Sequence, residues 1–339
     1  MWTRREGLAK TVRLLAAAAG AALEGEPMAE AEETDLSLHD PSTLIKEGGV
    51  YWVFGTGRGC PCFSSTDRLH WTSRGSVFSD PPGWIKEAVP ANTRNNIWAP
   101  DVRRVHGKYH LYYSVSTFGR NVSAIGLATS PTLEAAAWTD QGLVIRSEAR
   151  DDFNAIDPAI FQAPDGRLWL VFGSFWSGIK MIELHPATGK RLSPASPIYA
   201  LAKHPQDKNN AIEAPFLSFR EGFYYLFVNW DYCCRGSKSS YHIRVGRSEH
   251  ITGPYRDKAG VEMLQGGGSL LLGSTPDTGS GAPFDARVGP GHAGILSENG
   301  VDRFSFHYEY VRDRGGKTML EIRTVTWGHD GWPTVSPAV

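Results

Sequence analysis

The feature that most constrains the fold of this chain is a segment pattern that recurs about every 57 residues. In each copy, a short segment containing proline leads into an alternating strand, a glycine turn and an aromatic-rich strand. The four clearest copies, whose prolines are Pro41, Pro100, Pro158 and Pro215, are HDPSTLIKEGGVYWVFGTG, WAPDVRRVHGKYHLYYSVS, IDPAIFQAPDGRLWLVFGS and EAPFLSFREGFYYLFVNW. A looser fifth copy, GPGHAGILSENGVDRFSFHYEY, follows a glycine-rich insertion around residues 260–289.

Each copy is typical of adjacent antiparallel strands, because period-two alternation of polar and apolar residues is closed by a hairpin signal such as His106-Gly107 or Glu221-Gly222. The repeat is longer than the ~40–50 residues of common propeller blades, but it accommodates four strands with generous loops. A solenoid needs shorter units, and a β-sandwich does not repeat in this way. We therefore predict an all-β fold, a single five-bladed β-propeller over residues 36–339, with residues 1–35 as an N-terminal tail.

Charge and composition narrow the class of ligand. The 35 Lys and Arg residues nearly balance the 36 Asp and Glu residues, so the chain lacks the basic footprint of a nucleic-acid-binding protein. The 37 Gly, 11 Trp and 12 Tyr residues form a mixture that is common in β proteins whose rings stack on sugars. No run of ~20 apolar residues exists, so we expect no membrane span. A monomer that binds a neutral ligand fits this composition.

Residues 1–24 have the order of a secretory signal peptide, in which basic residues precede an apolar run. The basic residues are Arg4, Arg5, Lys10 and Arg13, and the run is LLAAAAGAAL. Because the run is short and rich in alanine, an exposed helix or a misplaced start is the alternative. An extracellular location is expected with a signal peptide, and a cytoplasmic one without it.

The four cysteines form two tight groups, Cys60 with Cys62 and Cys233 with Cys234. Neither group has the C-x₂-C spacing or the nearby histidine of a zinc site, so we do not expect a metal bound through thiolates. Adjacent Cys233 and Cys234 leave two possibilities open, a vicinal disulfide or a pair of buried free thiols.

The first strand of each propeller blade lines the central channel, so the residues that start the copies are expected to converge. These residues are Asp40, Trp98, Asp157, Glu213 and His292. One acid beside a proline is usually a turn or cap residue, but three acids at matching positions of three copies indicate a shared site. Carboxylates crowded in a narrow well repel, which raises at least one pKa and supplies the acid and base forms that glycosidic cleavage needs.

Eight segments, taken in order, resemble family 43 of the glycoside hydrolases and, within it, the endo-α-1,5-L-arabinanases. They are HDPS (39–42), NNIWAPDV (95–102), STFG (116–119), NAIDP (154–158), GSFWSG (173–178), IEAP (212–215), NWDYCCRG (229–236) and GPGH (289–292). The resemblance covers nearly everything from about residue 36 onward. It implies endo-acting hydrolysis of arabinan or arabino-oligosaccharides with inversion of configuration.

The resemblance also implies roles for the three acids. Asp40 is expected to be the general base that activates water, and Glu213 the general acid that protonates the leaving oxygen. Asp157 is expected to orient the acid and to keep its pKa high. Partial desolvation of Glu213 by Ile212 and the following Ala-Pro favours its protonated form.

Sugar contacts and a metal ligand follow from the same resemblance. The expected substrate-binding residues are Asp40, Trp98, Phe118, Gly119, Asn154, Asp157, Ser174, Phe175 and Trp176. Trp176 could equally pack inside a blade. His292 matches an axial histidine that helps to hold a calcium ion, mainly through water, and its alternative role is that of a hydrogen-bonded core histidine. No organic cofactor is expected.

Two other functions stay open. An exo-acting α-L-arabinofuranosidase or β-xylosidase shares the three carboxylates, although NNIWAPD, STFG and DYCCRG favour the arabinanase branch. A carbohydrate-binding propeller without catalysis is the alternative from another class, but it would require the loss of a carboxylate. Asp40 and Glu213 start copies one and four, which favours a gap of roughly 6.5–9.5 Å, wide enough for the water of an inverting reaction.

Overall fold

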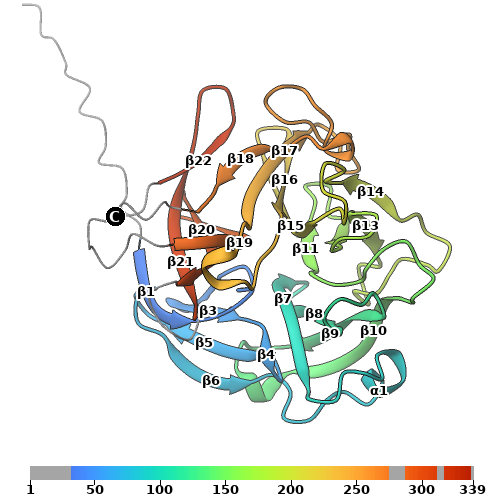
Figure 1. The fold of residues 1–339 in the computed structure, drawn as a ribbon. Helices are drawn as coiled ribbons and strands as arrows, with labels where there is room; N and C mark the ends of the chain where they lie inside the picture. Colours follow the sequence, from blue (N-terminus) through green and yellow to red (C-terminus); the bar gives the residue numbers. More distant parts are fainter. Residues whose placement is uncertain (1–31, 275–286, 311–316, 337–339) are drawn as a thin grey trace, which may run out of the picture.

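The computed structural model of the protein describes residues 32–274, 287–310 and 317–336. Five β-sheets follow one another in a ring around a common axis (Figure 1). The predicted all-β, five-bladed β-propeller is therefore confirmed. The proposed signal segment, residues 1–24, lies outside the described residues. Within those three ranges, no helix is long and apolar enough to cross a membrane.

The blades follow the chain order of the repeat. Blade one contains β2 (Ile45–Glu47), β3 (Val50–Phe54), β5 (Pro61–Ser65) and β6 (Thr72–Ser76), and blade two contains β4 (Gly57–Arg58), β7 (Asn96–Val105), β8 (Lys108–Val115), β9 (Ser123–Ser130) and β10 (Thr139–Ser147). Blade three contains β11 (Ala159–Gln162), β12 (Leu168–Phe172), β13 (Ile179–Leu184) and β14 (Tyr199–Ala202), and blade four contains β15 (Ile212–Arg220), β16 (Phe223–Trp230), β17 (His242–Ser248) and β18 (Ser269–Leu272). The helical segments are α1 (Ile85–Ala88), η1 (Ala135–Ala137), η2 (Gly236–Lys238) and η3 (Met263–Gln265).

Blade five is built from both ends of the described chain. It contains β19 (Arg287–Glu298), β20 (Val301–Tyr310), β21 (Thr318–Trp327) and β22 (Pro333–Val335), and β1 (Glu32–Ser37) pairs with β21 in antiparallel register. Residues 32–35, which the sequence placed in the N-terminal tail, therefore belong to blade five. A single strand without its own hairpin partner has no local turn signal, which is why the repeat pattern did not include it.

Apolar side chains fill the spaces between neighbouring blades. In β12 every residue is buried, because this second strand packs against blades on both of its faces. One apolar cluster joins Tyr112 of blade two to Leu170 of blade three, and another joins Val53 of blade one to Ile322 of blade five. Burial of these apolar surfaces holds the ring together.

Buried polar groups tie the inner strands together. The carboxylate of Asp101 accepts hydrogen bonds from the backbone N–H of Thr43 in blade one (3.0 Å) and of Ile160 in blade three (2.9 Å). The amide of Asn229 in blade four donates to Pro290 O (3.0 Å) and accepts from the His292 N–H (3.0 Å). Because buried polar groups cost free energy when they are unpaired, these bonds fix how the first strands approach one another.

One residue near the start of each inner strand has a left-handed backbone conformation. The five are Asp40 (φ 47°), Ala99 (φ 41°), Asp157 (φ 56°), Ala214 (φ 49°) and His292 (φ 62°). This conformation costs a residue with a Cβ atom about 1–2 kcal/mol. Such residues persist where the surrounding structure holds them, and they cluster at functional sites.

These five positions correct the alignment of the repeats. Asp40, Asp157 and His292 occupy the left-handed position itself, whereas Trp98 and Glu213 come one residue before it. The sequence pattern indicated that the three acids occupy matching positions, but the structure shows that Glu213 is offset by one residue from Asp40 and Asp157. The register of the inner strand shifts just after Trp98 and just after Glu213, so β7 and β15 begin to pair before the left-handed residue.

Candidate active site

Three carboxylates from three blades meet near the axis. Burial, followed by the charges of Glu213 and Asp40, raises the pKa of Asp157 well above its usual range. Burial likewise raises the pKa of Glu213, with the charge of Asp40 adding to it. The structure thus brings together the three acids that the sequence selected. Two carboxylates that repel one another do not ionise independently, so the two acids titrate as a pair.

Asp40 lies among imidazole rings. Its Oδ1 atom is 3.4 Å from His39 Nε2, 3.5 Å from His292 Nδ1 and 3.6 Å from His307 Nδ1, while Thr56 Oγ1 donates a hydrogen bond to Oδ2 (2.6 Å). Burial alone would raise the pKa of Asp40, but these neighbours together lower it to about 2. Asp40 is therefore ionised at neutral pH.

The histidines around Asp40 are themselves perturbed. Burial lowers the pKa of His292 and lowers that of His307 well below its usual range. His307 Nδ1 accepts a hydrogen bond from the Asp40 N–H (3.0 Å), which requires this nitrogen to be unprotonated. The two rings are therefore neutral at pH 7, and the carboxylate of Asp40 carries the local charge.

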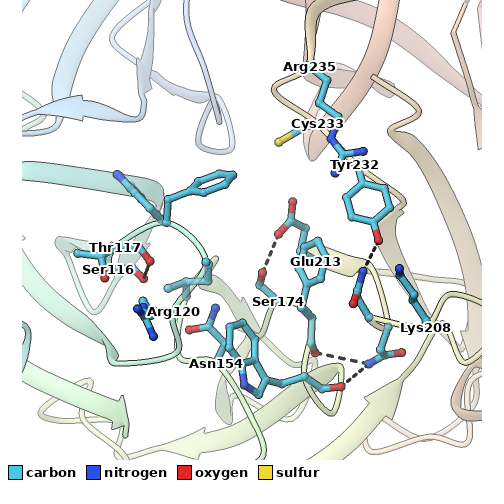
Figure 2. A pocket seen from close by; sticks show the side chains of 18 residues that line it. Ser116, Thr117, Arg120, Asn154, Ser174, Lys208, Glu213, Tyr232, Cys233 and Arg235 are labelled. Atoms are coloured by element: carbon cyan, nitrogen blue, oxygen red, sulfur yellow. Dashed lines mark hydrogen bonds between the residues drawn. The ribbon is translucent and has the colours of Figure 1, made fainter. Parts of the chain in front are cut away.

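Glu213 is held by a hydroxyl group and a phenol. Ser174 Oγ donates a hydrogen bond to Glu213 Oε2 (2.7 Å) (Figure 2). Tyr241, which is buried at the start of β17, also favours the ionised carboxylate by hydrogen bonding. The effect of burial exceeds both contributions, so the net pKa of Glu213 is raised. Glu213 can therefore carry a proton at a higher pH than an exposed glutamate.

Asp157 contacts the peptide that follows Glu213. Its Oδ2 accepts a hydrogen bond from the Ala214 N–H (3.2 Å), and its own N–H donates to Ser114 Oγ (2.9 Å). Asp157 is thus tied to blade two through its backbone and to blade four through its side chain. A change at Asp157 would displace the backbone that carries Glu213.

A cleft of about 640 Å³ opens above Glu213. Its lining includes every predicted sugar contact apart from Asp40 and Asp157, namely Trp98, Phe118, Gly119, Asn154, Ser174, Phe175 and Trp176 (Figure 2). The ring of Phe118 is 86% exposed and that of Trp176 is 39% exposed. Trp176 therefore faces the cleft, and its alternative role as packing within a blade is wrong. Exposed rings that border a cleft suit stacking on sugar faces.

Backbone contacts hold the rings of the cleft in place. Phe175 and Trp176 both have positive φ values (53° and 42°) in the loop after β12. The Phe175 N–H donates to Ile212 O (2.8 Å), next to Glu213, and Asn210 Nδ2 donates to Trp176 O (2.8 Å). The loop that presents the rings is therefore fixed to the strand that carries Glu213.

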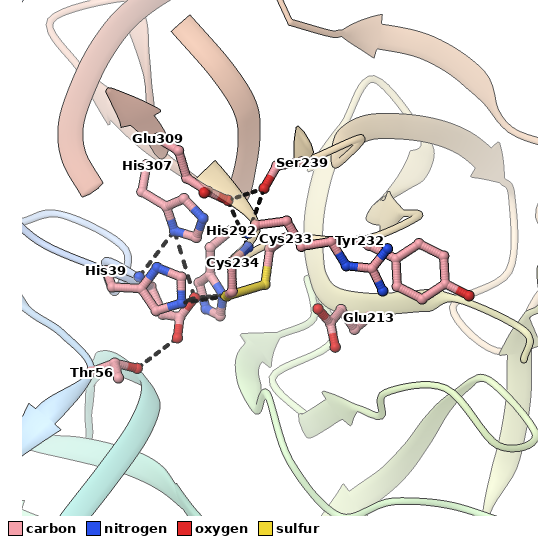
Figure 3. Close-up of a disulfide and its surroundings, with 12 residues drawn as sticks. His39, Thr56, Glu213, Tyr232, Cys233, Cys234, Ser239, His292, His307 and Glu309 are labelled. Carbon is pink, nitrogen blue, oxygen red and sulfur yellow. Dashed lines mark hydrogen bonds and ion pairs between the residues drawn. A yellow bond between two sulfur atoms is a disulfide. The ribbon is translucent and has the colours of Figure 1, made fainter. Parts of the chain in front are cut away.

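The structure shows which of the two states expected for Cys233 and Cys234, a vicinal disulfide or free thiols, is present. Cys233 and Cys234 form a vicinal disulfide, and Cys60 and Cys62 are buried free thiols. Cys233 lines the cleft. The side chain of Glu309 accepts hydrogen bonds from the backbone N–H groups of Cys234 (2.6 Å) and Gly236 (2.7 Å), which fixes this turn (Figure 3).

Several residues of the site escaped the sequence analysis. Thr56, His307 and Tyr241 lie outside the segments that start the copies, and no spacing in the chain marks them. His39 and Tyr232 lie inside quoted motifs, HDPS and NWDYCCRG, but were given no role. His307 comes from β20, whereas Thr56 follows β3 and Tyr241 precedes β17, and only the fold brings these three against the carboxylates.

Comparison with known proteins gives a consistent result. The family model described as Glycosyl hydrolases family 43 matches residues 34–333. The extracellular endo-α-(1→5)-L-arabinanase 1 of Bacillus subtilis (strain 168) is 44% identical over 301 residues, which cover 88% of this chain and 87% of the relative. The extracellular exo-α-(1→5)-L-arabinofuranosidase ArbA of Cellvibrio japonicus is 39% identical, covering 88% of this chain and 86% of the relative.

A solved structure agrees with these relatives. The α-L-arabinanase of Cellvibrio cellulosa, complexed with arabinohexaose, superposes with a TM-score of 0.80 at 37% sequence identity. The match covers 89% of this chain and 96% of that one. The similarity therefore extends over the whole propeller.

Proposed function

Since this chain belongs to family 43 of the glycosyl hydrolases, we propose that it cleaves linear α-1,5-L-arabinan internally, with inversion of configuration. One observation carries the proposal. The neighbours of Asp40 lower its pKa to about 2, whereas burial raises the pKa of Glu213, so one acid is ionised while the other can hold a proton. Carboxyl groups whose environments separate their pKa values are suited to be the base and the acid of one reaction.

Asp40 acts as the general base in this scheme. As an ionised carboxylate it accepts a proton from a water molecule on one face of the sugar, and the water oxygen attacks the anomeric carbon. Thr56 Oγ1 donates a hydrogen bond to Oδ2 and so fixes the orientation of the carboxylate. The neutral rings of His292 and His307 lie beside Oδ1 of this carboxylate.

Glu213 acts as the general acid. Its raised pKa keeps a proton available, and the proton passes to the glycosidic oxygen as the bond to the anomeric carbon breaks. The Ser174 hydroxyl then stabilises the carboxylate that remains. Asp157 orients the acid through the Ala214 N–H, and the charge of Asp40 helps to keep the proton on Glu213.

A calcium ion is proposed at His292. The His292 ring has no hydrogen-bond partner within the described residues, and its Nδ1 lies 3.5 Å from the carboxylate of Asp40. Calcium prefers six to eight oxygen ligands, so water molecules would supply most of its coordination beside this imidazole. A cation there would stabilise the negative charge of the surrounding carboxylates.

Chelation tests this metal. We expect exhaustive chelation and His292→Ala each to lower the melting temperature by a few degrees, because removal of a bound ion removes its stabilising free energy. Calcium should restore the chelated wild-type protein but not the variant. If the melting temperature and the activity are both unchanged after chelation, His292 is a hydrogen-bonded core histidine and not a metal ligand.

Endo cleavage and exo cleavage are both represented among the relatives. The Cellvibrio japonicus relative, named as an exo-acting arabinofuranosidase, supports terminal release as the second candidate. The exposed ring of Phe118 beside a cleft of about 640 Å³ supports binding of a chain that continues past the site, which favours endo cleavage. We further propose a secreted monomer, in line with the extracellular relatives.

A substrate panel with sizing of products tests the proposal. Linear arabinan should give short arabino-oligosaccharides and a fast fall in viscosity, whereas xylan should react much more slowly. Proton NMR of the first product should show a β-configured reducing end. Early release of arabinose alone would support the exo alternative, and an initial α-anomer would exclude inversion.

A further inference from the structure

The vicinal disulfide lies beside a histidine that is remote from it in sequence. His39 and Cys234 are 195 residues apart, but Cys234 Sγ is 3.7 Å from His39 Nε2 (Figure 3). One ligand atom from each of His39, Cys233 and Cys234 lies within 4.8 Å of the others. No histidine lies near these cysteines along the chain, which is why the sequence did not favour a thiolate site, but the fold brings His39 beside them.

The separation of these atoms suits a shared metal ion. Zinc binds sulfur at about 2.3 Å and imidazole nitrogen at about 2.0–2.1 Å with tetrahedral angles, which places the two ligand atoms about 3.6 Å apart. Cys234 Sγ and His39 Nε2 are already 3.7 Å apart. Thiolate and imidazole are also the ligands that soft and borderline divalent ions select over the oxygen-preferring calcium ion.

We propose that reduction of the Cys233–Cys234 disulfide creates a binding site for a thiophilic divalent cation, such as zinc or cadmium, with His39 as the third ligand. A phosphine reductant breaks the S–S bond and becomes a phosphine oxide by taking the oxygen of one water molecule. The two hydrogens of that water go to the two sulfur atoms. Binding of the cation then releases both protons to solvent.

The backbone around the thiols stays fixed when the disulfide opens. Glu309, which is buried, accepts hydrogen bonds from the N–H groups of Cys234 and Gly236 and from Ser239 Oγ (2.5 Å). None of these bonds involves a sulfur atom. Outer contacts of this kind orient the ligands of metal sites, so the reduced pair remains facing His39.

The site is reachable, and the other thiols are not. Cys233 lines the cleft and Cys234 is exposed, so a reductant and a cation can approach from solvent. Cys60 and Cys62 are fully buried, and burial raises the pKa of both thiols. Thiols in such surroundings are inert, which makes the two buried cysteines an internal control.

Binding of the cation stops hydrolysis. His39 Nε2 lies 3.4 Å from Asp40 Oδ1 as well as 3.7 Å from Cys234 Sγ. A cation on this nitrogen therefore sits against the carboxylate of Asp40 and can take it as a further ligand. This step rests on the proposed function, in which Asp40 must be free to accept a proton from water.

The test uses the intact protein, reduced by a phosphine that is then removed without oxygen. Titration with cadmium should produce the absorption band of a cadmium–thiolate bond, saturating at one ion per chain, and arabinan hydrolysis should fall to about a tenth or less. Zinc added beforehand should compete for the site, so that more cadmium is needed to produce the band. The oxidised protein should show neither the band nor the loss of rate.

Variants separate this site from other thiols. Cys234→Ser should lose both the band and the inhibition, whereas the matched buried variant Cys62→Ser should keep both if its melting curve shows it folded. His39→Gln should shift the cadmium titration to higher concentration. Reduced wild type without the band, or with the band but full activity, overturns the inference. An oxidised enzyme that does not cleave arabinan overturns the proposed function instead.

Discussion

The two sides of the catalytic well shift the pKa of a carboxylate in opposite directions. On the Asp40 side, imidazole rings and the Thr56 hydroxyl surround the acid and lower its pKa to about 2. On the Glu213 side, burial dominates over the Ser174 hydrogen bond and the pKa rises. Burial acts in the same direction on both carboxylates, so burial alone does not set the protonation state. The neighbours of each acid decide it.

This difference also sets how stability depends on pH. A lowered pKa in the folded state means that Asp40 contributes stability above its unfolded pKa, and that this contribution is lost as pH falls towards about 2. The raised pKa values of Glu213 and Asp157 act in the other sense, because stability falls as pH rises through the folded pKa values.

Removing either acid should have the largest effect. We expect Asp40→Asn and Glu213→Gln each to lower kcat by about 10²–10⁴-fold, since each loses a positioned proton donor or acceptor. Steady-state kinetics on linear arabinan would measure this loss, and melting curves should confirm folding. The exposed Glu221→Gln is the matched control and should be unaffected. A wild-type rate in either acid variant contradicts its assigned role.

The variant Asp157→Asn should have the second-largest effect on the rate. Displacement of the backbone that carries Glu213 should lower the rate by about 10²-fold. Asp157 and Glu213 repel one another when both are ionised, so removal of the Asp157 carboxyl group should also move the alkaline limb of the pH–rate profile to lower pH. A normal rate with an unchanged profile would reduce Asp157 to a structural cap.

A matched pair of hydroxyl deletions should sharpen the comparison between the two sides. Thr56→Val removes a donor to Asp40, so the acidic limb should move to higher pH, and Ser174→Ala removes a donor to Glu213, so the alkaline limb should move to higher pH. A hydrogen bond to a charged group contributes about 1.5–3 kcal/mol, which corresponds to about one to two pH units. If both variants move the same limb, the assignment of base and acid fails.

The smallest effect concerns the left-handed residues. Ala99→Gly should cost about 1–2 kcal/mol less stability than Ala128→Gly, since only Ala99 has a positive φ (41°) for glycine to relieve. Both alanines are buried in strands of blade two, so the loss of a methyl group is comparable. Chemical denaturation would compare them, and equal costs would mean that the left-handed position holds no strain.

The sequence predicted the fold well because the repeat is local. Alternation, a glycine turn and a proline start all fall within about 20 residues, and the structure turns each copy into a blade. It also selected the three acids, because they lie beside the prolines that start inner strands. The offset of Glu213 is visible in the sequence, because Ala214 stands between it and Pro215 while Asp40 and Asp157 directly precede their prolines, but the pattern did not tell which of these residues has the left-handed conformation.

Contacts across the ring could not be predicted from the sequence, because they join residues that are far apart along the chain. His307 reaches Asp40 from 267 residues away, and Cys234 meets His39 from 195 residues away. No spacing in the chain relates such pairs. The sequence therefore did not show that a histidine lies beside Cys234, although none is near it along the chain. Only the closed ring shows which side chains share the well.

The pairing of β1 with β21 has a consequence for the protein during its synthesis. Roughly 280 residues separate the two strands, and at about 5–20 residues per second the ribosome needs about 15–60 s to make the segment between them. Throughout that time the first strand has no partner, and Asp40 lacks His292 and His307. A nascent chain therefore carries the proposed base without its pKa-lowering surroundings. We therefore expect a chain that terminates before the last blade to be catalytically silent.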